Sequence, residues 1–215
     1  MMELVDRTVS DFCEVFASEV PAPGGGSAAA LDGAAGCALI GKVAKLTLGR
    51  KKYAAHEQFM EECVEQAEEF RQRFVGIIDR DAGVFNSVLK VIAMPKGTDE
   101  EKAMRADAMQ GALCTCTFPP IDAMGNALLA LEMAWEMQGR FNVNAASDLG
   151  VAALSLKAAV QGAWLNVLTN LVGIKDEVFV KKFREGGEGI LKKAIQLADS
   201  IHDSIHDSIL DSLQP

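Results

Sequence analysis

Apolar residues recur every three or four positions along most of this 215-residue chain, and the strict alternation typical of β-strands is almost absent. The pattern predicts an all-α fold, an up-and-down bundle of long helices. A short amphipathic helix is expected over residues 6–19, because Pro21 lacks a backbone N–H and restricts the residue before it. Residues 54–92 keep an apolar stripe on one face and glutamates on the other, which predicts one long helix or two in line.

Two further helices are predicted in the middle of the chain. Thr98 and Glu101 have the spacing of a capping box, which marks the start of the first one. We expect that helix to run to about Cys116 and to be broken near Pro119–Pro120, since an internal proline removes a helical hydrogen bond. Residues 121–138 are then expected to form the second helix.

A helix predicted over residues 149–172 is mostly Ala, Leu and Val, and Ser147 or Asp148 is expected to start it. A line of polar residues interrupts its apolar surface, and their spacing places them on one helical face. Polar groups buried without partners are costly, so the line either joins a hydrogen-bond network or faces a polar cavity; we favour the cavity. The line comprises Asp148, Ser155, Gly162, Asn166, and Thr169 or Asn170.

A glycine-rich turn, Pro21–Ser27, precedes another apolar helix, which is expected over residues 27–48 with Ser27 as its N-cap. Glycines before a helix start let other groups approach closely, and unpaired N–H groups point there. The turn is therefore either a tight structural loop, which the glycines alone favour, or a site for an anion or a carbonyl oxygen. Neither common phosphate-binding glycine motif matches the spacing of Gly24, Gly25 and Gly26.

The helix over residues 27–48 is apolar almost all round, as a buried helix or a membrane span would be. Asp32 near its middle, followed by Lys42 and Lys45, disfavours a bilayer. We therefore expect no membrane partner and place this helix at the centre of the bundle or at a dimer interface.

Three cations, Arg50, Lys51 and Lys52, follow that helix. Cations at this position complement the negative end of the helix dipole. They are also suited to docking carboxylates, and the cluster is conspicuous in so acidic a chain. The sequence leaves both interpretations open.

Composition narrows the class of protein. A formal net charge of −9 disfavours nucleic acid as a partner, because phosphate binding rests on clustered Lys and Arg. The five cysteines lack metal-ligand spacing and suit reduced thiols, and the N-terminus lacks a signal-peptide pattern. We therefore expect a cytoplasmic protein with a single domain over residues 1–215.

Asp81 is the carboxylate that stands out. It lies four residues after Ile77 and four before Phe85, which places it on the apolar stripe of its helix, whereas Asp79 falls off that stripe. Burial disfavours a charged carboxylate and should raise its pKa, which suits a proton shuttle near neutral pH. The sequence thus indicates acid–base chemistry by carboxylate and lysine, without a metal.

The end of the chain, residues 199–215, carries a four-residue Asp-Ser-Ile-His repeat. His202 and His206 have the i, i+4 spacing of two helical metal ligands, but nothing else completes a ligand set. We expect no metal here, and a peripheral amphipathic helix or a frayed tail.

Several motifs follow one another in a specific order, and together they resemble the cyclodeaminase domain of formiminotransferase-cyclodeaminase. Its stand-alone bacterial relatives, some named methenyltetrahydrofolate cyclohydrolase, share the resemblance, which covers about residues 5–185. The motifs are the glycine turn at 21–27, Leu-Thr-Leu-Gly-Arg-Lys-Lys-Tyr at 46–53, Asp81-Ala-Gly-Val-Phe85, Pro95-Lys96, and the stretches at 142–153 and 162–167.

The resemblance implies a homodimer or higher oligomer with a tetrahydrofolate substrate and no other cofactor. The deaminase closes the ring of 5-formiminotetrahydrofolate and releases ammonia, giving 5,10-methenyltetrahydrofolate; the cyclohydrolase hydrolyses that product to 10-formyltetrahydrofolate. The family's catalytic aspartate matches Asp81. The expected substrate-binding residues are Gly24, Gly25, Gly26, Ser27 and Asn144 around the pterin or the reacting carbon, Arg50, Lys51 and Lys52 at the glutamate carboxylates, and Asp148 and Asn166.

Three hypotheses remain open. The first is the cyclodeaminase. The second is the cyclohydrolase, which gains weight because the chain carries no recognisable formiminotransferase domain to supply formiminofolate. The third is a helical folate-binding or scaffold protein that has lost the chemistry.

Overall fold

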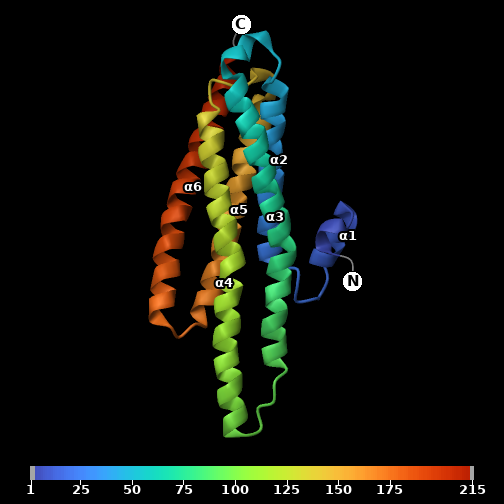
Figure 1. Ribbon diagram of the computed structural model, residues 1–215, viewed down its shortest axis with the longest axis vertical. Coiled ribbons are helices and arrows are strands. Elements are labelled where there is room, and N and C mark those ends of the chain that lie inside the picture. The colour runs from blue at the N-terminus through green and yellow to red at the C-terminus, as the bar shows by residue number, and fades with distance from the viewer. Residues whose placement is uncertain (1–2, 214–215) are drawn as a thin grey trace.

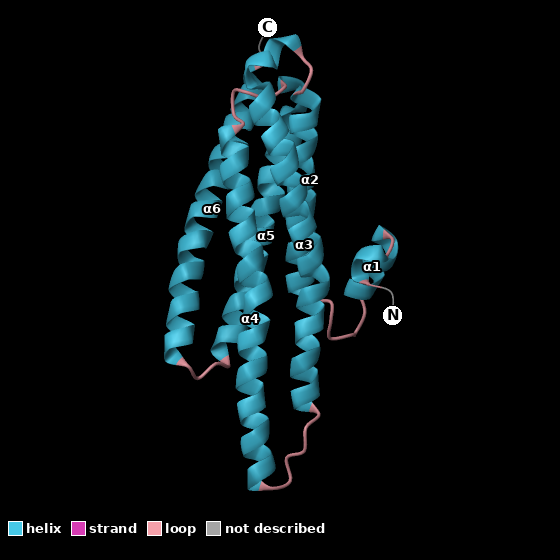
Figure 2. Ribbon diagram, viewed as in Figure 1, coloured by secondary structure: helices cyan, strands magenta, loops and turns pink. Residues whose placement is uncertain are grey.

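The computed structural model describes residues 3–213, whose regular structure is entirely helical (Figures 1 and 2). The predicted all-α fold is confirmed. The α-helices are α1 (Val9–Phe16), α2 (Gly25–Thr47), α3 (Glu57–Ile92), α4 (Asp99–Glu136), α5 (Ala146–Val172) and α6 (Glu177–Asp211). Short 3-10 helices, η1 (Leu4–Asp6), η2 (Lys51–His56) and η3 (Val143–Ala145), lie in the connections.

Helices α2 to α6 form an up-and-down bundle (Figure 1). α2 packs against α3 and α5, α4 packs against the same two helices, and α6 lies against α5 and α4. α1 stands to one side, next to α3 in the view of Figure 1. The far ends of α3 and α4 project beyond the other helices and enclose a small apolar cluster of their own: Val88, Val91, Ala112 and Cys116.

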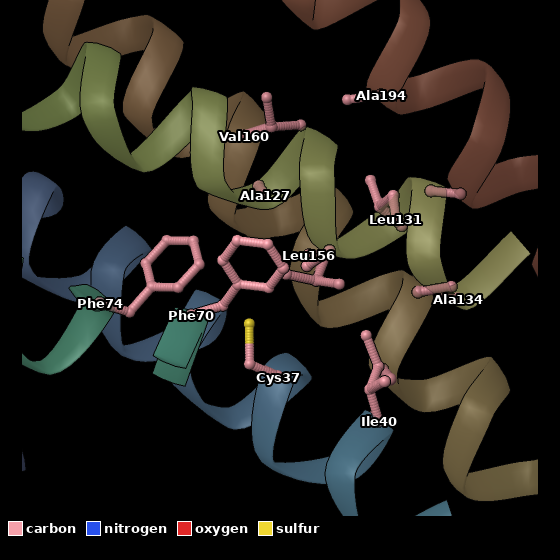
Figure 3. Packing of buried hydrophobic residues seen from close by; sticks show 14 of the residues in the cluster. Cys37, Ile40, Phe70, Phe74, Ala127, Leu131, Ala134, Leu156, Val160 and Ala194 are labelled. Carbon is pink, nitrogen blue, oxygen red and sulfur yellow. The ribbon is translucent and has the colours of Figure 1, made fainter. Parts of the chain in front are cut away.

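The main core is built from small and medium-sized side chains, which lets the helices approach closely (Figure 3). Gly33 on α2 shows how close: a Cβ built there would lie 2.3–2.5 Å from the ring of Phe74 on α3. Phe74 is fully buried and shares the core with Cys37, Phe70 and Leu156. The glycines of α2 are therefore packing positions, as the apolar helix requires.

Helix α4 is continuous, so the predicted break near Pro119–Pro120 is wrong. The capping box of Thr98 and Glu101 is present as predicted. A proline removes one donor but does not end a helix whose flanks are held by packing. Pro120 leaves the carbonyl of Cys116 without its helical partner, and the side chain of Asn170 on α5 donates to that carbonyl at 2.8 Å.

The C-terminal repeat is part of α6 and is not frayed over its described length. Ile201 and Ile205 are buried in the main core, whereas Ile209 is exposed. The histidines face outwards, and each Nδ1 lies beside the following aspartate. The last two residues of the predicted tail, 214 and 215, lie outside the described residues.

Two stretches, Gly25–Thr47 and Val143–Val172, are long and apolar enough to span a membrane. The core helices of soluble proteins meet the same criterion, and about half of each stretch is buried inside this bundle. The exposed side of α2 also carries Asp32, Lys42 and Lys45. The absence of a membrane partner remains a prediction.

Candidate functional site

A pocket of about 240 Å³ lies at the N-terminus of α2, beyond which α3, α4 and α5 continue. The glycine turn forms one wall, α3 contributes Asp81 and Phe85, and α5 contributes polar side chains. The lining comprises Pro21, Ala22, Gly24, Gly25, Gly26, Asp81, Ala82, Val84, Phe85, Cys116, Asn166, Thr169 and Asn170. The predicted cavity beside the polar line of α5 is thus present at the C-terminal half of that line.

Ser27 is not the N-cap of α2, because the helix begins two residues earlier, at Gly25, with Gly24 as its cap. The fully buried side chain of Ser27 has other partners. Its hydroxyl lies 3.0 Å from the carbonyl oxygen of Ile78 and 3.2 Å from Oδ2 of Asp81. Ser27 therefore joins the start of α2 to the middle of α3.

Asp81 lies directly against the glycine turn. A Cβ added to Gly26 would stand 2.3–2.5 Å from the atoms of its carboxyl group, so only glycine leaves room for it. Burial raises the pKa of Asp81 above its ordinary value of 3.8, and hydrogen bonds from the Ser27 hydroxyl and backbone N–H partly oppose that rise. The carboxyl is thus held by two donors in a partly dry pocket, as expected from its place on the apolar stripe.

The raised pKa of Asp81 makes a prediction about stability. A carboxyl with a higher pKa in the folded than in the unfolded chain keeps more protons when folded, so its contribution falls as pH rises from 3.8 towards the raised value. Asparagine does not ionise, so Asp81→Asn does not lose stability in this way as the pH rises. We expect the stability of Asp81→Asn relative to the wild type to rise as the pH increases above about 4 and to become constant once the pH exceeds the raised pKa of Asp81, measured by urea unfolding. A difference independent of pH would contradict this environment for Asp81.

The polar wall of the pocket includes residues that the sequence left unresolved. The polar line ended in Thr169 or Asn170, and the structure places both in the lining, together with Asn166 and Cys116. Asn166 Nδ2 donates to the carbonyl of Gly162 at 2.9 Å and lies 3.4 Å from where a Cβ on Gly25 would stand. Cys116 gave no sequence signal, because only the folding of α4 against α3 brings it here.

Five other predicted site residues lie at the opposite end of α2 and outside this pocket. Arg50, Lys51 and Lys52 follow the C-terminus of α2, and Asn144 and Asp148 precede or begin α5 beside it. At 1.5 Å per residue, the twenty residues from Ser27 to Thr47 span about 30 Å. The expectation that all these groups form one cleft is therefore wrong within a single chain, because α2 is straight and separates them.

The residues at that far end have structural partners. Arg50 Nε donates to the carbonyl of Leu46 at 2.8 Å, as the dipole interpretation of the cations predicts. Asp148 pairs with Lys42 at 2.9 Å. Asn144 is exposed, and its backbone N–H bonds to the side chain of Asn142. Lys51 and Lys52 are exposed cations.

No three histidine, cysteine or acidic side chains within residues 3–213 lie close enough to hold a metal ion. The titratable groups of the pocket are Asp81 and Cys116. Burial and the charge of Asp81 both raise the pKa of the Cys116 thiol. Asp81 is therefore the group in the pocket suited to accept and return a proton.

Comparison with known proteins places this chain in a family. A family model described as formiminotransferase-cyclodeaminase matches residues 8–188. The chain is 38% identical to methenyltetrahydrofolate cyclohydrolase of Methylorubrum extorquens, over 92% of this chain and 95% of that protein. It is 31% identical to formimidoyltransferase-cyclodeaminase of Mus musculus, over 89% of this chain but only 35% of that longer relative.

The fold has a solved counterpart as well. The crystal structure of formiminotetrahydrofolate cyclodeaminase from Thermotoga maritima superposes with a TM-score of 0.82 at 30% identity, covering 94% of this chain and 99% of that one. The sequence resemblance, noted from short motifs, thus extends through the whole bundle. The chain belongs to the formiminotransferase-cyclodeaminase family.

Proposed function

We propose that the protein is a folate one-carbon enzyme that acts on the carbon between N5 and N10 of tetrahydrofolate. The family supports the substrate class. The observation that carries the proposal is the Asp81 carboxyl, held by Ser27 in a polar pocket at the start of α2. The reaction that we favour is closure of 5-formiminotetrahydrofolate to 5,10-methenyltetrahydrofolate with release of ammonia.

One proton-transfer group is enough for this reaction. N10 attacks the amidinium carbon and forms the new C–N bond, which leaves a proton to be lost from N10. Asp81 accepts that proton as a carboxylate and gives it to the nitrogen that leaves as ammonia, and the methenyl cation remains. Burial raises the pKa of Asp81 above its ordinary value, so the carboxyl holds a proton more tightly, which suits a group that must both take and give one.

The cyclohydrolase reaction is the second candidate. It is favoured by the 38% identity to a relative of that name, which the chain matches over almost its full length. There a water molecule attacks the methenyl carbon and Asp81 takes one of its protons. Asp81 returns this proton to N5 as the C–N5 bond breaks, and the remaining hydroxyl proton is lost to solvent as the C=O of 10-formyltetrahydrofolate forms. The same carboxyl serves both reactions, because both pass through a tetrahedral carbon bonded to N5 and N10.

Purified protein supplied with each folate in turn decides between the candidates. A rise in methenyl absorbance from 5-formiminotetrahydrofolate, with ammonia released, supports the deaminase; an enzyme-dependent loss of methenyl absorbance supports the hydrolase. The same assay with a chelator tests the prediction that no metal is needed. Turnover of neither folate, combined with a rise in melting temperature on adding folate, would instead indicate the inactive folate-binding protein.

The protein is further proposed to work as a homodimer through the exposed side of α2 and α5. This face carries large apolar groups that no helix of the described chain covers: Leu46 is 39% exposed, Leu154 44%, Val151 50% and Leu165 66%. The exposed alanines Ala35 and Ala158 lie among them. Large exposed apolar groups along two packed helices indicate an interaction surface.

The distribution of charge along this face favours a two-fold dimer in which the two α2 helices run antiparallel. The end next to the pocket carries Asp32, whose pKa is raised by burial, and the opposite end carries Lys42 and then the cations at 50–52. An antiparallel pair with its axis near the middle of α2 sets each acidic end against a basic one. It also brings the cations of one subunit to the pocket of the other, where the folate glutamate carboxylates would need them.

A mixing experiment tests this shared site. Asp81→Asn is expected to be inactive, and a triple variant with Arg50, Lys51 and Lys52 changed to Ala should have a raised KM. Random assortment makes about half of the dimers mixed, each with one intact site. At a substrate concentration well below the raised KM of the triple variant, the mixture should therefore recover about a quarter of wild-type activity. No recovery from dimers shown to be mixed would contradict the antiparallel arrangement. Leu154→Glu should yield monomers by light scattering.

The cytoplasmic location also remains a proposal. All five cysteines are free thiols, and Cys37, Cys63 and Cys116 are buried. Disulfides persist mainly in oxidising compartments, so a chain with five unpaired thiols fits a reducing one.

A further inference from the structure

Pro120 leaves the carbonyl of Cys116, a residue that lines the pocket, without its helical hydrogen bond. In an α-helix the N–H of residue 120 would donate to the carbonyl of Cys116, four residues earlier, but proline has no N–H. Cys116 is buried and lines the pocket, where water reaches this carbonyl poorly. An unsatisfied buried carbonyl is costly, so a donor must come from another helix.

Asn170 on α5 supplies that donor, and in doing so it fixes its own amide group. Its Nδ2 lies 2.8 Å from the Cys116 carbonyl oxygen. Because a carbonyl only accepts hydrogen bonds, the nitrogen of the amide must face it, and the Oδ1 atom is left on the other side. Asn166 lies one turn earlier, and its Nδ2 likewise faces a carbonyl, that of Gly162, so its Oδ1 also lies away from that bond.

On its α5 side the pocket therefore presents two amide oxygens as acceptors. No donor within residues 3–213 bonds to Oδ1 of Asn166 or Asn170, and both residues line the pocket together with Asp81. A ligand that fits such a wall offers N–H donors and positive charge. In the 5-formimino folate the amidinium group has both, whereas the otherwise similar 5-formyl folate carries a carbonyl oxygen, an acceptor, at the same position.

We infer that Asn170 is a substrate-binding residue whose Oδ1 accepts a hydrogen bond from the formimino N–H, and that Pro120 is a positioning residue that orients it. The inference rests on the proposed function and deepens it by naming the group that separates formimino from formyl folates. Sites built to hydrogen-bond one substrate group reject analogues that cannot make that bond, because the acceptor of the protein is then left unpaired.

The test compares three variants: Asn170→Ala, Pro120→Ala and, as the matched control, Pro119→Ala. Each is assayed for kcat/KM with 5-formiminotetrahydrofolate and for Ki with 5-formyltetrahydrofolate. Pro119 is the neighbouring buried proline. An N–H at this position would bond to the carbonyl of Thr115, whereas Asn170 bonds to the carbonyl of Cys116. Circular dichroism establishes that each variant is folded.

Asn170→Ala should lower kcat/KM roughly 10- to 100-fold, as expected for a lost hydrogen bond to a charged group, and leave Ki for the formyl folate unchanged or lower. Pro120→Ala restores an N–H that competes for the Cys116 carbonyl, so a change in the same direction of roughly two- to tenfold is expected. Pro119→Ala should behave as wild type. If Asn170 had only a structural role, the variant would bind both folates more weakly, and by similar factors.

The outcomes separate the inference from the function that it rests on. A wild-type protein that turns over neither 5-formiminotetrahydrofolate nor 5,10-methenyltetrahydrofolate means that the proposed function has failed, whereas turnover of the methenyl folate alone overturns only the inference. Two other results overturn the inference alone. One is an active wild-type protein that binds the formyl folate as tightly as the formimino folate. The other is a ratio of kcat/KM for the formimino folate to 1/Ki for the formyl folate that stays unchanged in both Asn170→Ala and Pro120→Ala. Equal effects of Pro119→Ala and Pro120→Ala would show that the Cys116 carbonyl does not orient Asn170.

Discussion

Replacing Asp81 with Asn is expected to lower kcat by roughly 100- to 10,000-fold, the usual contribution of a general acid–base group. Asparagine keeps the shape of the side chain and can still accept from the Ser27 hydroxyl, so the fold should persist. It cannot accept and return a proton. The measurement is steady-state turnover of both folates, with circular dichroism as the check on folding.

Asp79→Asn is the matched control for this change. Asp79 lies on α3 two residues away, and its Oδ1 accepts from the backbone N–H of Leu4 at 2.8 Å, outside the pocket. Asparagine preserves that bond, because its carbonyl oxygen accepts equally. We expect near wild-type turnover from Asp79→Asn. Similar losses in both variants would show that α3 needs its carboxylates for structure, and that Asp81 is not the proton carrier.

Gly26→Ala is expected to reduce turnover roughly 100-fold, the cost of displacing a catalytic group by about 1 Å. The added Cβ would stand 2.3–2.5 Å from the Asp81 carboxyl, so either the carboxyl or the start of α2 must shift. Alanine favours a helix more than glycine does, so helix propensity offsets part of any loss of stability. The expected result is thus a low kcat in a protein that remains folded.

Gly24→Ala provides the control for Gly26→Ala. It lies two residues earlier in the same turn, nothing stands within 4 Å of the position of its Cβ, and its φ of −131° is open to any residue. The Asp81 carboxyl keeps its position, so kcat should be almost unchanged; because Gly24 lines the pocket, any effect should be confined to KM. If Gly24→Ala and Gly26→Ala are equally impaired, flexibility of the turn matters, and the space beside Asp81 does not explain the glycines.

The helical content followed directly from the periodicity, because each long helix buries one side and repeats its apolar residues accordingly. Element ends were less predictable. α2 starts at Gly25, since Ser27 bonds to Ile78 and Asp81 on α3 and does not cap its own helix. α4 passes through Pro119–Pro120, since a side chain on another helix replaces the lost donor. Both outcomes depend on contacts distant in sequence.

The sequence by itself determined that Asp81 lies on an apolar stripe and that a glycine turn precedes an apolar helix, because local spacing sets which residues share a helical face. Only the tertiary structure decided that these two features meet, that Asn170 joins them, and that the cations at 50–52 lie at the other end of α2. The reason is physical: spacing along a helix specifies a direction for each side chain, whereas its neighbours depend on which helices pack together and how far each one runs.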